Sequence, residues 1–281
     1  MRARVPASSA NLGPGFDTLA LALGLYVEVE VTEADSFSLQ AEGQGSELPQ
    51  DRDHFAAQVV RRVMGHDRVA ITVRSDIPLG RGLGSSAALA AAAAAAAGAD
   101  DVLAVAAAVD GHPENAAASI LGGLVAATTV EGLPVARHHH LDPDLRFVVV
   151  VPDRPLPTKE ARAALPASVP HADAAFNLGR MGILLAGLAD ASLLVAAATD
   201  DRLHQSQRSA LFPEAAVLLE GLRQAGGLAT CWSGAGPSLL AFCTSETAST
   251  VAEAGETLLR RTSVAGRVLS LEADHAGLVV S

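Results

Sequence analysis

The sequence has almost no lysine, since Lys159 is the only one in 281 residues. A Walker A phosphate loop needs Gly-Lys-Ser or Gly-Lys-Thr at the start of a helix, so this scarcity excludes a P-loop. The 20 basic residues are outnumbered by 31 acidic ones, which gives a formal net charge of −11. Phosphate contacts along a nucleic acid need clustered Lys and Arg. We therefore expect no nucleic-acid partner.

Cysteines and long apolar segments are also scarce. Cys231 and Cys243 are the only cysteines and both lie in apolar strand-like segments, so neither a disulfide framework nor a zinc site is supported. The chain shows no signal segment, and its alanine-rich run is too short and too weakly hydrophobic to span a membrane. We expect a cytoplasmic protein with no membrane partner. Although only 3% of the residues are aromatic, 49% are hydrophobic, which suffices for a full core.

Glycine and alanine are abundant, above all in the stretch from Ile77 to Gly98, IPLGRGLGSSAALAAAAAAAAG. Alanine is the best helix former, so a helix is predicted over 85–97, beginning at the two serines. At a helix start the first N–H groups lack partners and the dipole is positive, and glycines let an anion approach them. The stretch predicts a phosphate loop, or else an ordinary strand-to-helix turn with a serine cap. Its G-x-G-x-G spacing disfavours a dinucleotide site.

Hydrophobic periodicity predicts a mixed chain in which strands and helices alternate. The proline-rich segment 151–158 is the best candidate for a linker. The histidine triplet 138–140 falls in a turn-rich connection, which indicates a solvated loop rather than a metal site. The predicted strands are 25–31, 37–43, 69–73, 122–130, 145–152, 227–233, 237–243 and 266–273, and the predicted helices are 55–64, 85–97, 101–109, 158–165, 171–188, 213–226 and 245–261.

Three glycine-bearing motifs stand at the start, the middle and the end of the chain: VPASSANLGPGFDTLALAL, IPLGRGLGSSAALAAA and CWSGAGPSLLAF. Together and in this order they resemble the GHMP family of small-molecule kinases over nearly the whole chain. The resemblance implies an α/β (α+β) fold of two lobes with the substrate between them. It implies an N-terminal α/β lobe with the glycine-rich phosphate loop, residues 1–145, and a C-terminal ferredoxin-like α/β sandwich, residues 146–281. A homodimer is a further expectation from the family.

Four further stretches narrow the resemblance: PASSANLGPGFD, GHPENAAASILGG, TKEARAALP and DRLHQSQRSALFP. They look like the versions found in family members that act on L-homoserine. This implies ATP-dependent phosphorylation of the side-chain hydroxyl of L-homoserine to O-phospho-L-homoserine, on the route to threonine. Two alternatives stay open. One is a kinase for another small alcohol, such as mevalonate or shikimate, and the other is a non-catalytic relative that senses metabolites.

Phosphoryl transfer depends on positioning and on neutralising the charge of the phosphoryl oxygens. Without a suitable lysine, we expect backbone N–H groups, Arg81 as a catalytic cation and Mg²⁺ to supply that charge. Mg²⁺ prefers hard oxygen ligands, and Ser86, followed by Ser85, is the candidate hydroxyl. The resemblance implies that Asp110, just before the GHP stretch, is the carboxylate ligand. Relatives commonly carry glutamate in place of Asp110, whose alternative role is an N-cap for the following turn. The expected ATP-binding residues are Pro78, Leu79, Gly80, Arg81, Gly82, Leu83, Gly84, Ser85, Ser86 and Ala87.

A zwitterionic substrate needs an anionic partner for its ammonium group and cationic partners for its carboxylate. The resemblance assigns the ammonium to Asp17 and the carboxylate to Arg162 and Arg208. Thr158 lies one helical turn before Arg162 and is expected to orient the reacting hydroxyl, and the family is thought to work without a dedicated protein base. His54 either borders the adenine or starts a helix at the surface. The expected substrate-binding residues are Asn11, Asp17, His112, Asn115, Arg162, Arg208 and Gly234.

Overall fold

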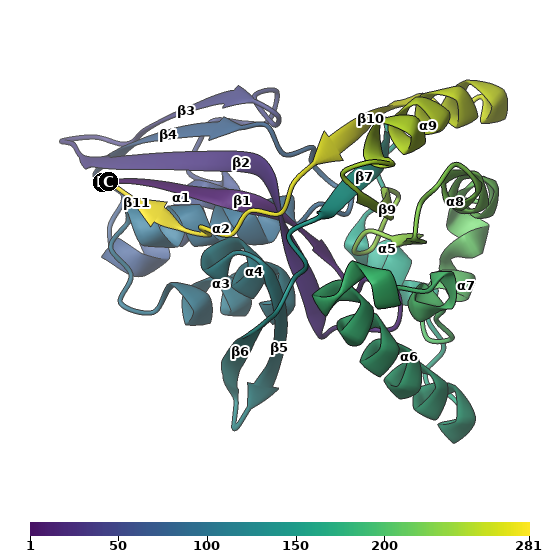
Figure 1. Cartoon of the computed structure of the whole chain (residues 1–281). Coiled ribbons are helices and arrows are strands. Elements are labelled where there is room, and N and C mark those ends of the chain that lie inside the picture. The colour runs from purple at the N-terminus through teal and green to yellow at the C-terminus, as the bar shows by residue number, and fades with distance from the viewer.

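The computed structural model describes residues 1–281, and its two sheets belong to two lobes that lie side by side (Figure 1). The first sheet has seven strands in the order β11–β1–β2–β4–β3, with β5 paired to β2 and β6 to β5. Only β3 and β4 run parallel to each other. The strands are β1 (Arg2–Ala10), β2 (Leu19–Glu33), β3 (Ser38–Gly43), β4 (Val69–Ser75), β5 (Leu124–Val130), β6 (Leu133–His139) and β11 (Val279–Val280).

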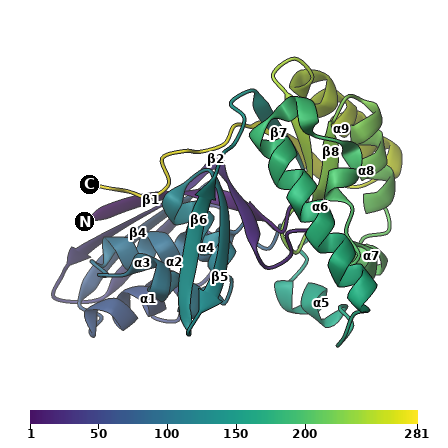
Figure 2. The same cartoon turned by 60° about the horizontal axis from the view of Figure 1, so that its bottom comes forward.

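Four helices of the first lobe pack together beside this sheet (Figure 2). They are α1 (Phe55–Met64), α2 (Ser85–Ala96), α3 (Val102–Asp110) and α4 (Pro113–Leu121). The central helix α2 contacts the other three helices as well as β1 and β2. Nine of its alanines are buried, and their small side chains allow neighbours to approach from every side. The alanine run is therefore the centre of the first lobe.

The second lobe contains a four-stranded antiparallel sheet in the order β10–β7–β9–β8. Its strands are β7 (Leu145–Pro152), β8 (Ala229–Trp232), β9 (Leu239–Thr244) and β10 (Gly266–Leu271), and α8 (Ala215–Gln224) and α9 (Ala248–Thr262) cover one face. The β-α-β-β-α-β order confirms the expected ferredoxin-like sandwich. Successive residues of β7 face opposite sides: Phe147 and Val149 join the larger core cluster, whereas Val148 and Val150 pack with the residues of α8 and α9.

Three helices and three 3₁₀ turns between β7 and α8 complete the second lobe. They are α5 (Thr158–Ala163), the long α6 (His171–Ala189), α7 (Gln205–Arg208) and the 3₁₀ turns η1 (Ala191–Leu193), η2 (Ala196–Thr199) and η3 (Ser209–Leu211). After β10 the chain returns to the first lobe, where β11 pairs with β1, so the two termini lie together (Figure 1). No helix has the length and apolar character needed to cross a membrane.

Two sequence-based interpretations of this architecture are wrong. His138 and His139 are exposed residues of β6, because this segment pairs with β5 instead of forming a loop. The proline-rich segment does not join the lobes, since residues 153–157 connect β7 to α5 within the second lobe. The chain crosses between the sheets at residues 140–144 and 272–278. The proposed division at residue 145 stays a prediction.

Most predicted helices and strands are present with ends shifted by a few residues, but several elements were missed. The sequence interpretation assigned no strand to β1 and no helix to α4 or α7, and β6 and β11 were also missed. Of the missed strands, β6 forms a tight hairpin with its neighbour β5, whereas β11 depends on a partner distant in the chain, since it pairs with β1. Periodicity along a single segment does not reveal such pairing.

Candidate active site

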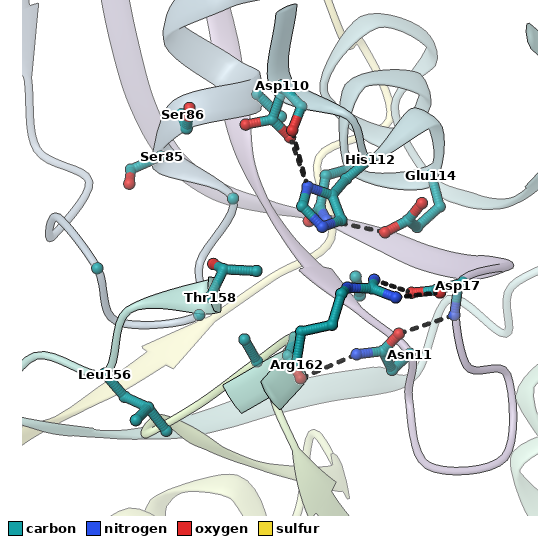
Figure 3. A pocket seen from close by; sticks show the side chains of 18 of the residues that line it. Asn11, Asp17, Ser85, Ser86, Asp110, His112, Glu114, Leu156, Thr158 and Arg162 are labelled. Atoms are coloured by element: carbon teal, nitrogen blue, oxygen red, sulfur yellow. Dashed lines mark hydrogen bonds and ion pairs between the residues drawn. The ribbon is translucent and has the colours of Figure 1, made fainter. Parts of the chain in front are cut away.

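A cavity of about 320 Å³ is lined by residues of both lobes. It collects the end of β1, the glycine loop before α2, the α3–α4 junction, α5, and the turn between β8 and β9 (Figure 3). Ala10, Glu114, Leu156 and Ala235 also line it. The sequence-predicted residues in its lining are Asn11, Asp17, Gly80, Gly82, Gly84, Ser85, Ser86, Ala87, Asp110, His112, Asn115, Thr158, Arg162, Arg208 and Gly234.

The glycine loop has a backbone conformation that residues with a side chain rarely adopt. Gly80, Gly82 and Gly84 have φ angles of 61°, 71° and 64°, in the left-handed region that favours glycine. A Cβ atom on Gly82 would collide with the carbonyl oxygen of Ser233, and one on Gly84 with the hydroxyl of Ser8. The loop thus packs directly against the ends of β1 and β8, at the mouth of the cavity.

The N-terminus of α2 presents free donors to this cavity. Gly84 is the N-cap and provides no side-chain hydrogen bond. The backbone N–H groups of Ser85, Ser86 and Ala87 donate to no protein acceptor, and all three residues line the cavity. Unpaired N–H groups at the positive end of a helix bind anions. The residues present therefore fit a phosphate group.

Arg81 does not line the cavity, in contrast to the predicted role as a charge-neutralising cation. Its Nε donates to the carbonyl of Pro152 at 2.9 Å and its Nη1 to that of Leu79 at 2.7 Å, while Nη2 donates to the carbonyl of Asp153. These carbonyls hold the guanidinium at the end of β7. Three other members of the predicted ATP set, Pro78, Leu79 and Leu83, also lie outside the lining.

Asp110 and Ser86 line the cavity from two different helices (Figure 3). Asp110 is the last residue of α3, and its carboxylate lies 3.2 Å from Nδ1 of His112. This contact raises the pKa of His112, although burial opposes the increase. Asp110 is not the N-cap of α4, because His112 occupies that position. A hydroxyl and a carboxylate suit Mg²⁺, which completes its shell with water and phosphate oxygens.

The predicted ammonium partner and one predicted carboxylate partner bind each other. Arg162 donates to both carboxylate oxygens of Asp17, at 2.8 and 3.0 Å (Figure 3). The backbone N–H of Asp17 donates to Oδ1 of Asn11 at 3.0 Å, and Nδ2 of Asn11 donates to the carbonyl of Gly234 at 2.9 Å. The ion pair raises the pKa of the Arg162 guanidinium further above its usual value. Asn11 thus holds Asp17 and the β8–β9 turn together.

Arg208 is the second predicted carboxylate partner, and only 2% of its surface is exposed. Its Nη1 donates to the carbonyl of Gly234 at 3.1 Å and its Nε to that of Ala161 at 3.3 Å. Burial lowers the pKa of Arg208 to about 10, with a further contribution from Arg162. A buried guanidinium without a carboxylate partner is costly, which suits it to an anionic ligand.

Glu114 is a cavity residue that the sequence interpretation missed. It lies in the first turn of α4, is only 2% exposed, and accepts one hydrogen bond of 3.1 Å from Nδ2 of Asn115. Burial raises the pKa of its carboxyl. Its place between the two predicted residues His112 and Asn115, at the start of the same helix, was the available signal.

His54 is the N-cap of α1, where its Nδ1 accepts from the backbone N–H of Ala56 at 3.2 Å. His54 therefore starts a helix, which is one of its two predicted roles, but it is buried rather than at the surface. It does not line the cavity. The position of His54 therefore does not indicate where the adenine binds.

Comparisons with known proteins find similarity over the whole length of the chain. Two family descriptions match the chain: the GHMP kinases N terminal domain over residues 53–123 and the GHMP kinases C terminal over residues 183–259. The homoserine kinase of Streptomyces coelicolor is 42% identical over 269 residues, which cover 89% of this chain and 87% of that protein. That of Desulfitobacterium hafniense is 35% identical and covers 100% and 99%. The crystal structure of homoserine kinase from Cytophaga hutchinsonii superposes with a TM-score of 0.87, at 25% identity and 100% and 97% coverage.

Proposed function

The chain belongs to the GHMP kinase family, and we propose that it transfers the γ-phosphoryl group of ATP to the side-chain hydroxyl of L-homoserine. The product is O-phospho-L-homoserine, an intermediate on the route to threonine. The observation that carries this proposal is that a helix N-terminus with free N–H donors and a set of charged side chains line one cavity. The first binds phosphate, and the second binds a small charged acceptor.

The phosphates of ATP bind at the start of α2, where the N–H groups of Ser85, Ser86 and Ala87 are free. The hydroxyl of Ser86 and the carboxylate of Asp110 would hold Mg²⁺, which would supply positive charge to neutralise the phosphoryl oxygens. The glycines let the loop pack closely against Ser8 and Ser233, which fixes its position before α2. The protein's contribution to phosphoryl transfer is then mainly positioning and electrostatic stabilisation.

The acceptor replaces the ion pair between Asp17 and Arg162 with two new ion pairs to its own charged groups. Its ammonium group binds the carboxylate of Asp17, and its carboxylate binds Arg162 together with the buried Arg208. A ligand that carries only one charge would separate the pair and leave one of the two side chains without a partner, which is unfavourable. The arrangement therefore favours a zwitterion over mevalonate or shikimate, which lack the ammonium group.

Thr158 begins α5 and lines the cavity on the same helix as Arg162. We assign it to orienting the reacting hydroxyl toward the phosphoryl group, since both residues face the cavity one helical turn apart. The pairing of Asp17 with Arg162 supports a role for Asp17 in binding. We assign no protein base to the reaction.

Release of ADP tests the proposal most directly. Purified protein with Mg·ATP should release ADP with L-homoserine and not with mevalonate, shikimate, L-threonine or no acceptor. ATP binding without turnover on any acceptor would instead support a non-catalytic, metabolite-sensing relative. Turnover with mevalonate or shikimate at the rate seen with homoserine would contradict the exchange of ion-pair partners.

A cytoplasmic location and a homodimer are further proposals, which rest on the family resemblance. Sedimentation equilibrium at several protein concentrations would test the dimer. A molecular mass near 28.5 kDa at every concentration, the mass of a single chain, would contradict it.

A further inference from the structure

His204 lies behind the cavity and contacts the arginine that reaches into it. It is fully buried, and no step of the proposed reaction uses it. It is the N-cap of α7, the four-residue helix that ends at Arg208. Nδ1 of His204 lies 3.0 Å from Nη1 of Arg208, and Nε2 lies 2.8 Å from the carbonyl oxygen of Gly13. Each ring nitrogen therefore has one hydrogen-bond partner, and Nε2 also lies 3.7 Å from the buried carboxylate of Asp201.

These two partners fix the protonation state of His204. A guanidinium only donates, so Nδ1 must accept; a carbonyl only accepts, so Nε2 must donate. The histidine is neutral, with its proton on Nε2. Burial lowers the pKa of His204 to about 4, against the opposing effect of Asp201, and the charge of Arg208 lowers it further. A proton on Nδ1 would remove the acceptor and place two cations in contact.

The ring of His204 is held in place from several sides. Phe16 stacks on it, with ring centroids 5.1 Å apart and an angle of 23° between the planes. The carboxylate of Asp201 accepts from the backbone N–H groups of Leu203, His204 and Gln205 at 2.7 to 2.9 Å, which fixes the start of α7. The ring is thus a rigid support for its partner.

The hydrogen bonds of Arg208 determine which part of its guanidinium faces the ligand. Nε donates to Ala161 and Nη1 donates to both His204 and Gly234. Neither proton of Nη2 takes part in these bonds, and Arg208 lines the cavity. Nη2 is therefore the group left to donate to a ligand.

We propose that His204 is a positioning residue for the substrate: by accepting from Nη1 it orients the guanidinium of Arg208 so that Nη2 meets the substrate carboxylate. The proposal rests on the proposed role of Arg208 as a carboxylate partner. Without the acceptor on His204, Nη1 keeps only its hydrogen bond to the carbonyl of Gly234. The guanidinium of Arg208 can then rotate about its Cδ–Nε bond. Binding of the carboxylate then weakens, whereas binding of ATP does not change.

Three variants test the roles of the two ring nitrogens of His204 separately. His204→Phe keeps a ring for Phe16 and has no acceptor, and we expect the KM for homoserine to rise about tenfold, a loss of about 1.4 kcal/mol. His204→Asn keeps an acceptor near the position of Nδ1 and should restore most of the native KM. His204→Gln places its amide near the position of Nε2, so it keeps the donor to Gly13 but not the acceptor, and should resemble His204→Phe. In all three the KM for ATP should stay within about twofold of the native value.

A substrate analogue gives the readout that a merely structural role would not change. 3-Aminopropan-1-ol has the hydroxyl and the ammonium group of homoserine but no carboxylate. The ratio of kcat/KM for homoserine to kcat/KM for this analogue should fall about tenfold in His204→Phe and His204→Gln, because the analogue makes no use of Arg208. In an Arg208→Ala background the same changes at His204 should have almost no effect on this ratio.

The outcomes distinguish this inference from the proposed function. Equal losses for homoserine and the analogue, or equal KM values for the Asn and Gln variants, would overturn the role of His204 while the kinase activity stands. If Arg208→Ala itself leaves the KM for homoserine unchanged, Arg208 is not the carboxylate partner and both assignments fail. If His204→Phe does not fold, the comparison of the KM for homoserine between His204→Asn and His204→Gln still tests the role of His204.

Discussion

Asp17 and Arg162 connect the two lobes across the cavity through a bidentate ion pair of 2.8 and 3.0 Å. Their side chains keep 41% and 47% of their surface exposed, and an exposed pair contributes only about 0–1 kcal/mol to stability. A zwitterionic ligand that offers a new partner to each side chain can therefore replace the pair at little cost. The same pair sets the charge pattern that the ligand has to match.

Asp17→Asn removes the carboxylate charge and keeps the shape of the side chain. We expect the KM for homoserine to rise about tenfold or more, because a charge-assisted bond to the ammonium becomes a neutral one. The free energy of unfolding should change by less than about 1 kcal/mol. Asp173→Asn, which breaks the exposed pair with Arg202, is the control. Steady-state kinetics measure the KM for homoserine in both variants. An unchanged KM in Asp17→Asn would remove Asp17 from the substrate site.

Gly84→Ala should abolish most ATP binding. The new Cβ would collide with the hydroxyl of Ser8, at a residue whose φ is 64°. The matched control is Gly98→Ala, since Gly98 also has a positive φ of 83° but has nothing within 4 Å of a Cβ. The positive φ should cost each variant about 1 kcal/mol of stability, and the collision adds to this loss in Gly84→Ala. Only Gly84→Ala should weaken ATP binding about tenfold or more. Calorimetric titration with ATP would show the contrast, and equal affinities in the two variants would place the phosphates elsewhere.

Asp110→Ala should raise the Mg²⁺ concentration needed for half-maximal activity about tenfold, since one of two protein ligands is lost. Asp100→Ala is the control, because Asp100 is an exposed carboxylate just before the other end of α3. Titration of activity with Mg²⁺ at saturating ATP, after chelator treatment, measures the effect. The same Mg²⁺ dependence in both variants would rule out Asp110 as a ligand.

Glu114→Gln should stabilise the ligand-free protein. Burial raises the pKa of Glu114, so the folded protein binds its proton more tightly than the unfolded chain, and the cost of the buried carboxylate appears as pH rises through the raised pKa. We expect a gain of about 1 kcal/mol at pH 8 that shrinks toward pH 4. Urea unfolding of this variant and of the exposed control Glu253→Gln measures it. A gain in the free energy of unfolding that grows toward low pH would contradict the prediction.

Local features of the site could be predicted from the sequence, whereas its long-range contacts could not. The alanine helix and the glycine loop follow from propensity and spacing within one short segment. The pairing of Asp17 with Arg162 joins residues 145 positions apart, and nothing in either segment indicates that the two charges meet. Arg81 was assigned to the phosphates because it lies between the glycines, but its long side chain reaches the carbonyls of the second lobe instead.

The return of the chain to its first strand affects the order of folding during synthesis. The backbone of Ser281 exchanges two hydrogen bonds of 2.9 Å with that of Arg2, so the outer edge of β1 has no partner until residues 279–281 have left the ribosome. An open strand edge is a site for pairing with other chains. The first lobe, although its synthesis begins first, is completed only after the second lobe has been made, and nascent chains that stall before residue 279 should be the ones that aggregate.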